Sequence, residues 1–428
     1  MMSVKTSVIA VFDIGKTNKK VFLWDTSFQI VFEKQQHFAE IVDEDGFACE
    51  DLAALQQWIV STFTEICQMP EFELIGLNFS AYGASFVYVD RMGEPVAALY
   101  NYLKPATVPF PYADFGGESE FARKTASPIL GNLNSGLQVY AATFKPFWPE
   151  VFQALHLPNY LTSLFTGRFM SEITSIGCHT ALWDFDLGQY HPWVSTIEDR
   201  LAPISSVAFE EIDGIHYGLG LHDSSAALVP YLRSISDEFV LLSTGTWCIA
   251  MHPFNESLLT AEELSNDVLC YLQPNGKSVK ASRLFGGHFH EEQVARLEQH
   301  FGGSYKDCRF NDSVFELKPS DSSVFECAFA SRNLDDFTDL ASAYDQFMVD
   351  LVGQQIFSLN LLLKDAPVKQ LLVDGGFSKN EWYMRLLAHA FPELEVYAAE
   401  VAQASALGAA LMVYKGEIPK NLIQLKRY

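Results

Sequence analysis

Apolar positions along the chain form short continuous runs and helix-type repeats. Residues 7–13 and 21–24 are rich in Val, Ile and Phe, and Gly15 and Asn18 lie between them, which predicts the two strands of a hairpin. Residues 50–66 carry apolar side chains at helical spacing, and residues 73–80 form an apolar run typical of a buried strand. The order hairpin, helix, strand predicts an α/β layer.

A second block of regular structure begins near residue 238. Residues 238–252 again form an apolar run interrupted by a small glycine turn, and residues 370–391 indicate a strand, a glycine turn and a helix. Residues 404–414 indicate a helix of small residues. Two such hairpins in one chain predict an internal structural duplication. The polar segment 234–238 predicts a boundary between an N-terminal domain, 1–233, and a C-terminal domain, 234–428.

The segment between residues 100 and 200 follows neither the helix nor the strand period. It is rich in Pro, Tyr and Phe, as in NYLKPATVPFPYADFGG. Irregular aromatic segments line a substrate cleft in some proteins and form a lid or a packing insert in others. The pattern leaves these alternatives open.

Length and charge limit the classes of function. The chain has 428 residues, 49% of them hydrophobic, which suffices for two domains with separate cores. Its 29 Lys and Arg against 53 Asp and Glu give a net charge of -24, which disfavours nucleic acid and anionic membranes as partners. The first apolar run is short and is cut by Asp13, so no signal peptide or membrane span of about 20 residues is predicted, and we expect a cytoplasmic protein. Seven cysteines without a CxxC pair indicate reduced, structural thiols.

Two glycine turns are candidate phosphate sites. The turns at residues 15–18 and 243–246 follow buried strands, and glycine exposes backbone N–H groups that a phosphate can accept. Lys16 and Lys20 add positive charge beside the first turn. Asp13, at the end of the first strand, is a candidate ligand for Mg²⁺ that bridges phosphates. The alternative for each turn is a simple hairpin connection.

The segment DGGFSKN, residues 374–380, is a candidate nucleotide site. Paired glycines between a strand and a helix allow a flat ligand to approach the backbone at the helix N-terminus, and Asn380 offers a side-chain donor. The alternative is that Ser378 only caps the helix.

The segment GLGLHDSSAALVPYL, residues 218–232, carries a candidate catalytic base. Asp223 lies between a glycine-rich approach and a small-residue helix, where a carboxylate could accept a proton from a substrate hydroxyl that attacks a phosphoryl group. The alternative is an N-cap of the helix. His222 is either a buried, hydrogen-bonded histidine or a sugar ligand. No Walker phosphate loop, HExxH or GxSxG motif occurs, which argues against the commonest competing kinases and hydrolases.

In this order the motifs DIGKTNKK, GLHDSSAAL, LLSTGTW and LLVDGGFSKN resemble those of the FGGY family of carbohydrate kinases, in the actin, sugar kinase and Hsp70 superfamily. The resemblance covers nearly the whole chain. It implies an α/β fold of two ribonuclease H-like (actin-like ATPase) domains, each with a five-stranded mixed sheet, and an interdomain cleft. The N-terminal domain would bind sugar and the C-terminal domain the nucleotide.

The resemblance also implies site residues and cofactors, with ATP and Mg²⁺ as the cofactors. Asp223 would be the catalytic base and Asp13 the metal ligand. The expected cofactor-binding residues are Gly15, Lys16, Thr17, Asn18, Lys20, Thr244, Gly245, Thr246, Gly286, Gly287, Gly375, Gly376, Ser378 and Asn380, and the expected substrate-binding residues are Tyr82, Gly83, Ser85, Asn101, Tyr102, His222 and Asp223.

The segment FSAYGASFVYVD and the pair His222–Asp223 resemble the rhamnulokinase and fuculokinase branch of the family. This predicts a ketose substrate such as L-rhamnulose, L-fuculose or a pentulose. Ser85 differs from the aspartate of that branch, and Tyr102 and Pro105 stand where related kinases carry Asp and Arg. The alternatives are a kinase for another polyol, such as a tetritol or glycerol, and a catalytically silent protein that binds ATP or sugar. One sequence does not fix the oligomeric state, for which a homodimer is one option.

Overall fold

The computed structural model describes residues 5–320, 324–364 and 366–428, and it divides into two compact units. The first unit contains the chain up to Ser234 together with Cys270–Lys277 and Ala402–Leu422. The second contains Ile235–Leu269, Ser278–Val401 and Ile423–Tyr428. The first long segment of the first unit ends at Ser234, next to the predicted boundary. The units differ from the predicted domains because Cys270–Lys277 and Ala402–Leu422 also belong to the first unit.

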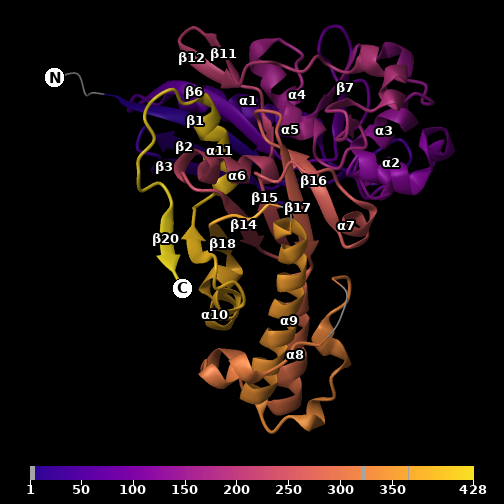
Figure 1. The fold of residues 1–428 in the computed structure, drawn as a ribbon. Helices are drawn as coiled ribbons and strands as arrows, with labels where there is room; N and C mark the ends of the chain where they lie inside the picture. The colour runs from indigo at the N-terminus through magenta and orange to yellow at the C-terminus, as the bar shows by residue number, and fades with distance from the viewer. Residues whose placement is uncertain (1–4, 321–323, 365) are drawn as a thin grey trace. The chain divides into compact units, whose positions relative to one another are not determined.

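The first unit is built on a mixed sheet in the order β11-β12-β6-β1-β2-β3, with β13 also pairing with β6 (Figure 1). Strands β1, β2 and β3 are antiparallel neighbours, whereas β6 runs parallel to β1 and to β12 and β13. Val, Ile, Leu and Phe fill β1 and β2, so both faces of these strands are buried. The strands are β1 Thr6–Ile14, β2 Lys19–Asp25, β3 Ile30–Gln36, β6 Phe72–Ala81, β11 Phe209–Ile212, β12 Ile215–Gly218 and β13 Leu221–His222.

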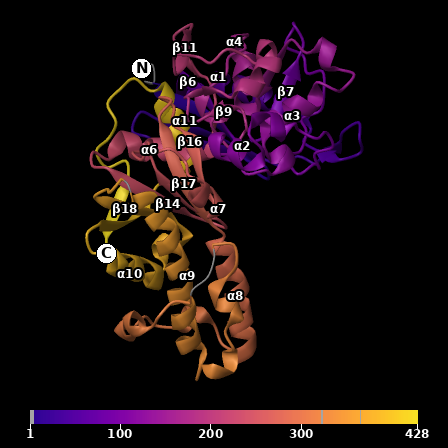
Figure 2. The same ribbon diagram turned by 45° about the vertical axis from the view of Figure 1, so that its right-hand side comes forward.

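The second unit repeats this arrangement in the order β16-β17-β15-β14-β18-β19-β20. Strands β14, β15 and β17 are antiparallel neighbours, and β18 and β19 run parallel to β14 (Figure 2). The strands are β14 Phe239–Thr244, β15 Cys248–His252, β16 Val268–Leu272, β17 Ser278–Leu284, β18 Gln370–Gly375, β19 Glu395–Glu400 and β20 Gln424–Arg427.

Both sheets share one topology, in which three antiparallel strands begin the sheet and later strands add in parallel. The predicted duplication and the α/β class are therefore confirmed. The expectation of five strands in the main sheet of each domain is wrong, because the main sheet of each unit has seven described strands. The hairpin β11–β12 and the short β13 extend the first sheet, and β16 and β20 extend the second at its two edges.

Helices cover both sheets. In the first unit, α1 begins after Asp51, whose carboxylate accepts a hydrogen bond from Ala54 N, and its apolar stripe joins the core of β1 and β6. In the second unit the long α9 packs against β17 and α8. The larger helices are α1 Leu52–Gln68, α4 Leu157–Thr166, α6 Asp223–Ser234, α8 Gly286–Phe301, α9 Leu340–Leu363, α10 Glu381–Ala390 and α11 Ala404–Val413. Among the described residues, no helix has both the length and the apolar character needed to cross a bilayer.

The aromatic segment between residues 100 and 200 forms a core of its own. Phe110, Phe121 and Trp193 are buried there and pack ring against ring. This packing supports the interpretation of the segment as an insert with its own core. The short elements of this segment are α2 Glu118–Lys124, α3 Ser135–Ala142, β8 Gln153–His156, α5 Ile173–Ile176, β9 Trp183–Asp184 and β10 Gln189–Tyr190. Three short strands precede it, β4 Ile41–Val42, β5 Ala48–Cys49 and β7 Phe86–Val89. The short helix α7 Ala261–Ser265 belongs to the second unit.

Helix α11 packs unusually closely on α6 and β6 of the first unit. A Cβ atom on Gly408 would lie 1.9 Å from the carbonyl oxygen of Ala226 in α6. On the other side, buried Asn78 of β6 donates from Nδ2 to the carbonyl oxygen of Ala409 and accepts from Gly220 N. The small residues predicted in 404–414 are therefore required by this contact, which also fixes the start of α6.

We predict that Gly408→Ala destabilises the protein by at least about 2 kcal/mol, because the added methyl group forces α11 away from α6. Helix propensity alone predicts the opposite sign, since alanine is favoured over glycine by about 1 kcal/mol inside a helix. Denaturant unfolding of the full chain distinguishes the two effects. Increased stability of the variant would contradict the close packing.

Candidate active site

The candidate catalytic residues lie at the carboxyl edge of the first sheet. Asp13 on β1 is paired with Ser80 on β6, and the parallel β13 pairs Leu221 with Ser80. Because these three strands run in the same direction, their last residues come to the same edge of the sheet. Asp223 follows β13 directly and begins α6. The fold thus places both predicted carboxylates at one edge of the sheet although they are 210 positions apart in the sequence.

Asp13 is surrounded by hydroxyl groups and by a second carboxylate. Its Oδ1 accepts a hydrogen bond of 3.1 Å from Ser405 Oγ at the start of α11. Burial raises the pKa of Asp13, and the nearby charge of Asp223 raises it further, against the lowering effects of Ser80, Ser405 and Lys20. A carboxylate whose proton affinity is raised by burial and by a second carboxylate would be stabilised in its charged form by a divalent cation.

The residues fit Mg²⁺ in the way the family suggests. In the part of the chain that the structure describes, no three His, Cys, Asp or Glu side chains form a cluster that could hold a metal ion. Mg²⁺ in phosphotransferases is generally held by one or two carboxylates together with substrate phosphates and water. Asp13 offers such a carboxylate, so a magnesium ion would depend on the nucleotide for its remaining ligands.

Asp223 has the environment of a proton acceptor. Its Oδ1 accepts from Ser224 N at 2.6 Å and lies 3.2 Å from His222 Nε2. Burial raises the pKa of Asp223 to about 6, although 38% of the side chain remains exposed and water moderates the rise. A carboxylate whose pKa lies close below neutral pH is ionised and still basic enough to take a proton.

His222 is buried and hydrogen-bonded on both sides of its ring. Nε2 lies 2.9 Å from Cys178 Sγ and Nδ1 lies 3.4 Å from Ser225 Oγ, while the backbone N–H donates to Thr174 Oγ1. Burial lowers the pKa of His222 to about 4, so the ring is neutral at pH 7. Of the two interpretations from the sequence, this geometry favours the buried, hydrogen-bonded histidine. Cys178 has no sequence signal that would have identified it.

Gly83 is packed against this histidine. A Cβ atom at Gly83 would lie 3.1 Å from His222 Cδ2 and 3.2 Å from Cys178 Sγ. Ser85 is buried, with its carbonyl oxygen bonded to Leu157 N. The structure therefore brings Gly83 and His222 together, as the substrate prediction requires.

The predicted sugar residues Tyr82 and Tyr102 stand next to each other, with ring centroids 6.3 Å apart. The Tyr82 hydroxyl donates to Glu50 at 2.7 Å, and Glu50 forms a buried ion pair with Lys19. Burial and the charge of Asp223 raise the pKa of Tyr102, which indicates that Tyr102 lies near Asp223. Lys19 and Glu50 could not be predicted as partners from the sequence, because their pairing depends on contacts between distant segments.

The first glycine turn is closed by a hydrogen bond from Gly15 N to Asn18 O and leaves Thr17 and Asn18 exposed. Lys16 Nζ pairs with Glu40 at 3.2 Å and lies 5.8 Å from the centroid of the Tyr82 ring. Lys20 Nζ lies over the Phe22 ring. Asn101 is another predicted sugar residue. Its side-chain amide donates a hydrogen bond to Ala48 O and accepts one from Leu103 N. The predicted roles of these residues toward ligands stay predictions.

The second unit contains a cavity of about 560 Å³ at the carboxyl edge of its sheet. Three of its lining segments are those predicted from the sequence, namely the turn after β14, the start of α8 and the turn after β18. Three other predicted residues of these segments do not line the cavity, namely Gly286, Gly375 and Ser378. The lining residues are Thr244, Gly245, Thr246, Gly287, His290, Glu291, Tyr305, Gly376, Phe377, Lys379 and Asn380.

Thr244 and two glycines hold these turns together. Thr244 Oγ1 donates to Asp374 O at 2.5 Å and accepts from Phe377 N at 2.9 Å. Gly375 has φ of +88°, and a Cβ atom there would lie 2.0 Å from Thr244 O. A Cβ atom on Gly287 would lie 2.0 Å from Gly245 O. Only glycine permits this approach of three backbone segments.

Aromatic rings form one wall of this cavity. His290 lies 5.3 Å from the ring centroids of both Tyr305 and Phe377, and burial lowers its pKa to about 4. Asn380 caps α10 through a bond from Tyr383 N to its Oδ1 and donates from Nδ2 to Tyr344 OH. The alternative that Ser378 caps the helix is therefore wrong, since Ser378 Oγ bonds to Gly375 O. A flat, uncharged ring matches this wall by stacking.

We predict that Gly375→Ala destabilises the second unit and disrupts this cavity, whereas Gly376→Ala leaves folding unchanged. At Gly375 the new methyl group meets Thr244 O in a backbone conformation that L-residues rarely adopt, and the cost is expected to exceed about 2 kcal/mol. At Gly376 the closest atom outside its neighbours is 3.9 Å from the added Cβ. Denaturant unfolding of both variants checks this, and equal stability would contradict the role assigned to Gly375.

Comparison with known proteins finds a family model that matches part of the chain and relatives of known type. Residues 325–414 match the family model described as the FGGY family of carbohydrate kinases, C-terminal domain. A rhamnulokinase of Pectobacterium carotovorum subsp. carotovorum (strain PC1) is 25% identical over 294 residues, which are 62% of this chain and 57% of that protein. The matched region therefore spans little more than half of the relative.

Solved structures share the fold along almost the entire chain. A carbohydrate kinase from Novosphingobium aromaticivorans has a TM-score of 0.78 at 22% identity, covering 99% of this chain and 94% of that one. A ligand-bound xylulose kinase from Lactobacillus acidophilus gives 0.72 at 15% identity, covering 99% and 93%. Plasmodium falciparum glycerol kinase with ADP gives 0.71 at 13% identity, covering 96% and 89%. The predicted two-domain actin-like ATPase fold is confirmed by these structures, and residues 325–414 are similar to the C-terminal domain of the FGGY family of carbohydrate kinases.

Proposed function

We propose that the protein transfers the γ-phosphoryl group of ATP to a hydroxyl group of a small carbohydrate. The observation that carries the proposal is Asp223, a carboxylate with a raised pKa at the edge of the first sheet that also presents Asp13. The glycine-built cavity of the second unit supports it, because it combines exposed backbone groups for phosphates with an aromatic wall for a base.

In the proposed reaction Asp223 takes the proton of the substrate hydroxyl as that oxygen forms its bond to the γ-phosphorus. The bond between the γ-phosphorus and the β–γ bridging oxygen breaks, and ADP leaves. His222 stays neutral and fixes the edge from which Asp223 projects. The backbone of the Gly15–Asn18 turn and of Gly245 and Thr246 would bind phosphate oxygens.

Magnesium, when bound with ATP, would neutralise phosphate charge, and Asp13 is the residue we assign to it. Ser405 and Ser80 hold that carboxylate in place from α11 and β6. Lys16 and Lys19 are engaged with Glu40 and Glu50.

We propose a ketose as the substrate, of the rhamnulose, fuculose or pentulose type. The similarity to a rhamnulokinase and the adjacent His222 and Asp223 support this choice. Tyr82 and Tyr102 near the base would pack against the carbon chain of the sugar. A polyol such as glycerol or a tetritol is the second candidate, favoured by Ser85 and Tyr102 at positions that differ from the rhamnulokinase branch.

A screen of ADP formation across ketoses and polyols tests the proposal. We expect one ketose to raise the rate of ADP formation at least about a hundredfold above the rate without sugar, since water reacts poorly in its place. The compound with the highest kcat/KM is then identified as the substrate. A glycerol or tetritol preference would overturn the ketose assignment, and ATP binding without ADP formation from any compound would overturn the kinase.

We predict that Asp223→Asn lowers kcat at least about a thousandfold with little change in the Kd for ATP, because the amide accepts no proton and ATP is assigned to other residues. Isothermal titration with a non-hydrolysable ATP analogue gives the Kd. The exposed Glu71→Gln is the control for loss of one negative charge. A variant that keeps the wild-type rate would exclude Asp223 as the base.

A further inference from the structure

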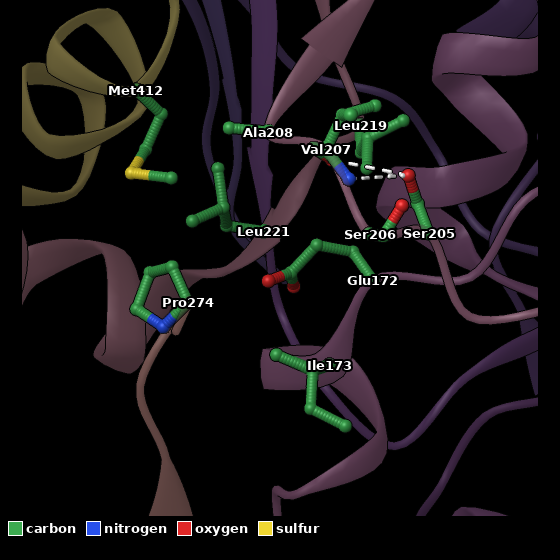
Figure 3. A pocket seen from close by; sticks show the side chains of 10 residues that line it. All are labelled: Glu172, Ile173, Ser205, Ser206, Val207, Ala208, Leu219, Leu221, Pro274 and Met412. Carbon is green, nitrogen blue, oxygen red and sulfur yellow. Dashed lines mark hydrogen bonds between the residues drawn. The ribbon is translucent and has the colours of Figure 1, made fainter. Parts of the chain in front are cut away.

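A second cavity lies in the first unit, and its lining includes none of the predicted ATP and sugar residues. Its volume is about 200 Å³, and apolar side chains make up most of its wall (Figure 3). The chain supplies them from the loop before β11, the segment leading to β13, the turn after β16, and α11. They are Ile173, Val207, Ala208, Leu219, Leu221, Pro274 and Met412, with Ser205 and Ser206 on one side.

One carboxylate projects into this apolar cavity. Figure 3 shows the Glu172 side chain directed into the space between Ile173, Leu221 and Pro274. Glu172 is only 8% exposed, and burial raises its pKa to about 7. The other nine lining side chains are uncharged, and Arg, Lys or His side chains are absent from the described lining.

The position of the carboxylate is fixed from its other side. Glu172 Oε2 accepts hydrogen bonds from the N–H and the hydroxyl of Thr174, and the same hydroxyl accepts from His222 N. These bonds orient Glu172 without neutralising it, so the fold already bears the cost of burying the charge. A preorganised carboxylate gains from a cationic partner without further ordering.

The chemistry of the cavity selects among cations. A divalent metal ion prefers several oxygen ligands, whereas the described lining offers one carboxylate among aliphatic side chains. A primary ammonium group needs one carboxylate and a few neutral acceptors, which the hydroxyl of Ser206 and water can supply. The apolar wall then matches an alkyl group. A cavity of about 150 Å³ holds a benzene molecule, so about six to eight non-hydrogen atoms fit here.

We propose that this cavity binds a small primary alkylammonium compound, whose ammonium group pairs with Glu172 and whose branched alkyl group packs on Leu219, Leu221 and Met412. The compound would enter the cavity beside the loop 205–208. Ser206, Val207 and Ala208 of this loop are exposed, whereas Glu172, Leu219 and Leu221 are buried. This binding is independent of the proposed phosphotransfer.

Titration calorimetry of the full chain with 3-methylbutylammonium and with its neutral isostere 3-methylbutan-1-ol tests the proposal. The ammonium ion stays charged below pH 9, while Glu172 loses its proton as pH rises through about 7. The ionised fraction of Glu172 then grows from about a tenth at pH 6 to about nine tenths at pH 8. We expect the Kd of the ammonium compound to fall about tenfold over this range, and that of the alcohol to stay constant or rise.

Among the groups on the elements that pack around Glu172, Asp223 also titrates near 6, so the Glu172→Gln variant is needed to assign the pH change to Glu172. His222 on β13 is neutral above about pH 5, and Asp223 on α6 titrates near 6 at the edge of the sheet. Glu210 on β11 pairs with Arg168, and α11 carries no charged side chain. Lys277 lies at the end of the segment that supplies Pro274.

Glu172→Gln separates binding from folding, because its amide oxygen still accepts from Thr174 N. We expect at least a tenfold weaker ammonium affinity and no pH dependence, with Glu71→Gln unchanged. Ala208→Trp, at the exposed rim, should block both probes. Absence of ammonium binding at pH 8, equal affinity of amine and alcohol at all pH values, or unchanged binding in Glu172→Gln would each overturn the proposal.

Discussion

The parallel pairing of β1, β6 and β13 is the constraint on which the candidate site depends. Its register sets Asp13 opposite Ser80 and Ala81 opposite His222, so three segments far apart in the sequence end at one edge. A shift of one residue in any of these strands would turn these side chains to the other face of the sheet. Asn78 and α11 secure the register, because Asn78 binds the backbone of both α11 and the approach to β13.

The second sheet uses the same constraint for a different purpose. There the parallel pair β14 and β18 sets Thr244 opposite Gly375, and the two turns after these strands meet through the Thr244 hydroxyl. The first sheet presents carboxylates at this edge, whereas the second presents glycine backbone. One topology thus presents the proposed proton acceptor in one unit and a cavity lined by glycine turns in the other, and the proposed phosphotransfer needs both.

The sequence predicted the elements well where a local pattern controls them. Hairpins, the helix 50–66 and the glycine turns follow from hydrophobic period and turn residues, and the motif residues at Asp13, Asp223 and Gly375 mark the strand ends. Cys178 beside His222, Glu50 beside Tyr82 and Ser405 beside Asp13 could not be predicted, because each pair joins segments 32 to 392 residues apart. The seven-stranded sheets were missed because the added strands are short and carry weak patterns.

In the proposed reaction a sugar hydroxyl, activated by Asp223, receives the γ-phosphoryl group of ATP. Phosphorus NMR of a reaction with ATP, Mg²⁺ and the preferred ketose is the decisive test, because it observes the bond that forms. We expect a new phosphate monoester signal that grows in step with ADP and is absent with Asp223→Asn. Release of inorganic phosphate in place of the ester, or an ester formed equally well by that variant, would contradict it.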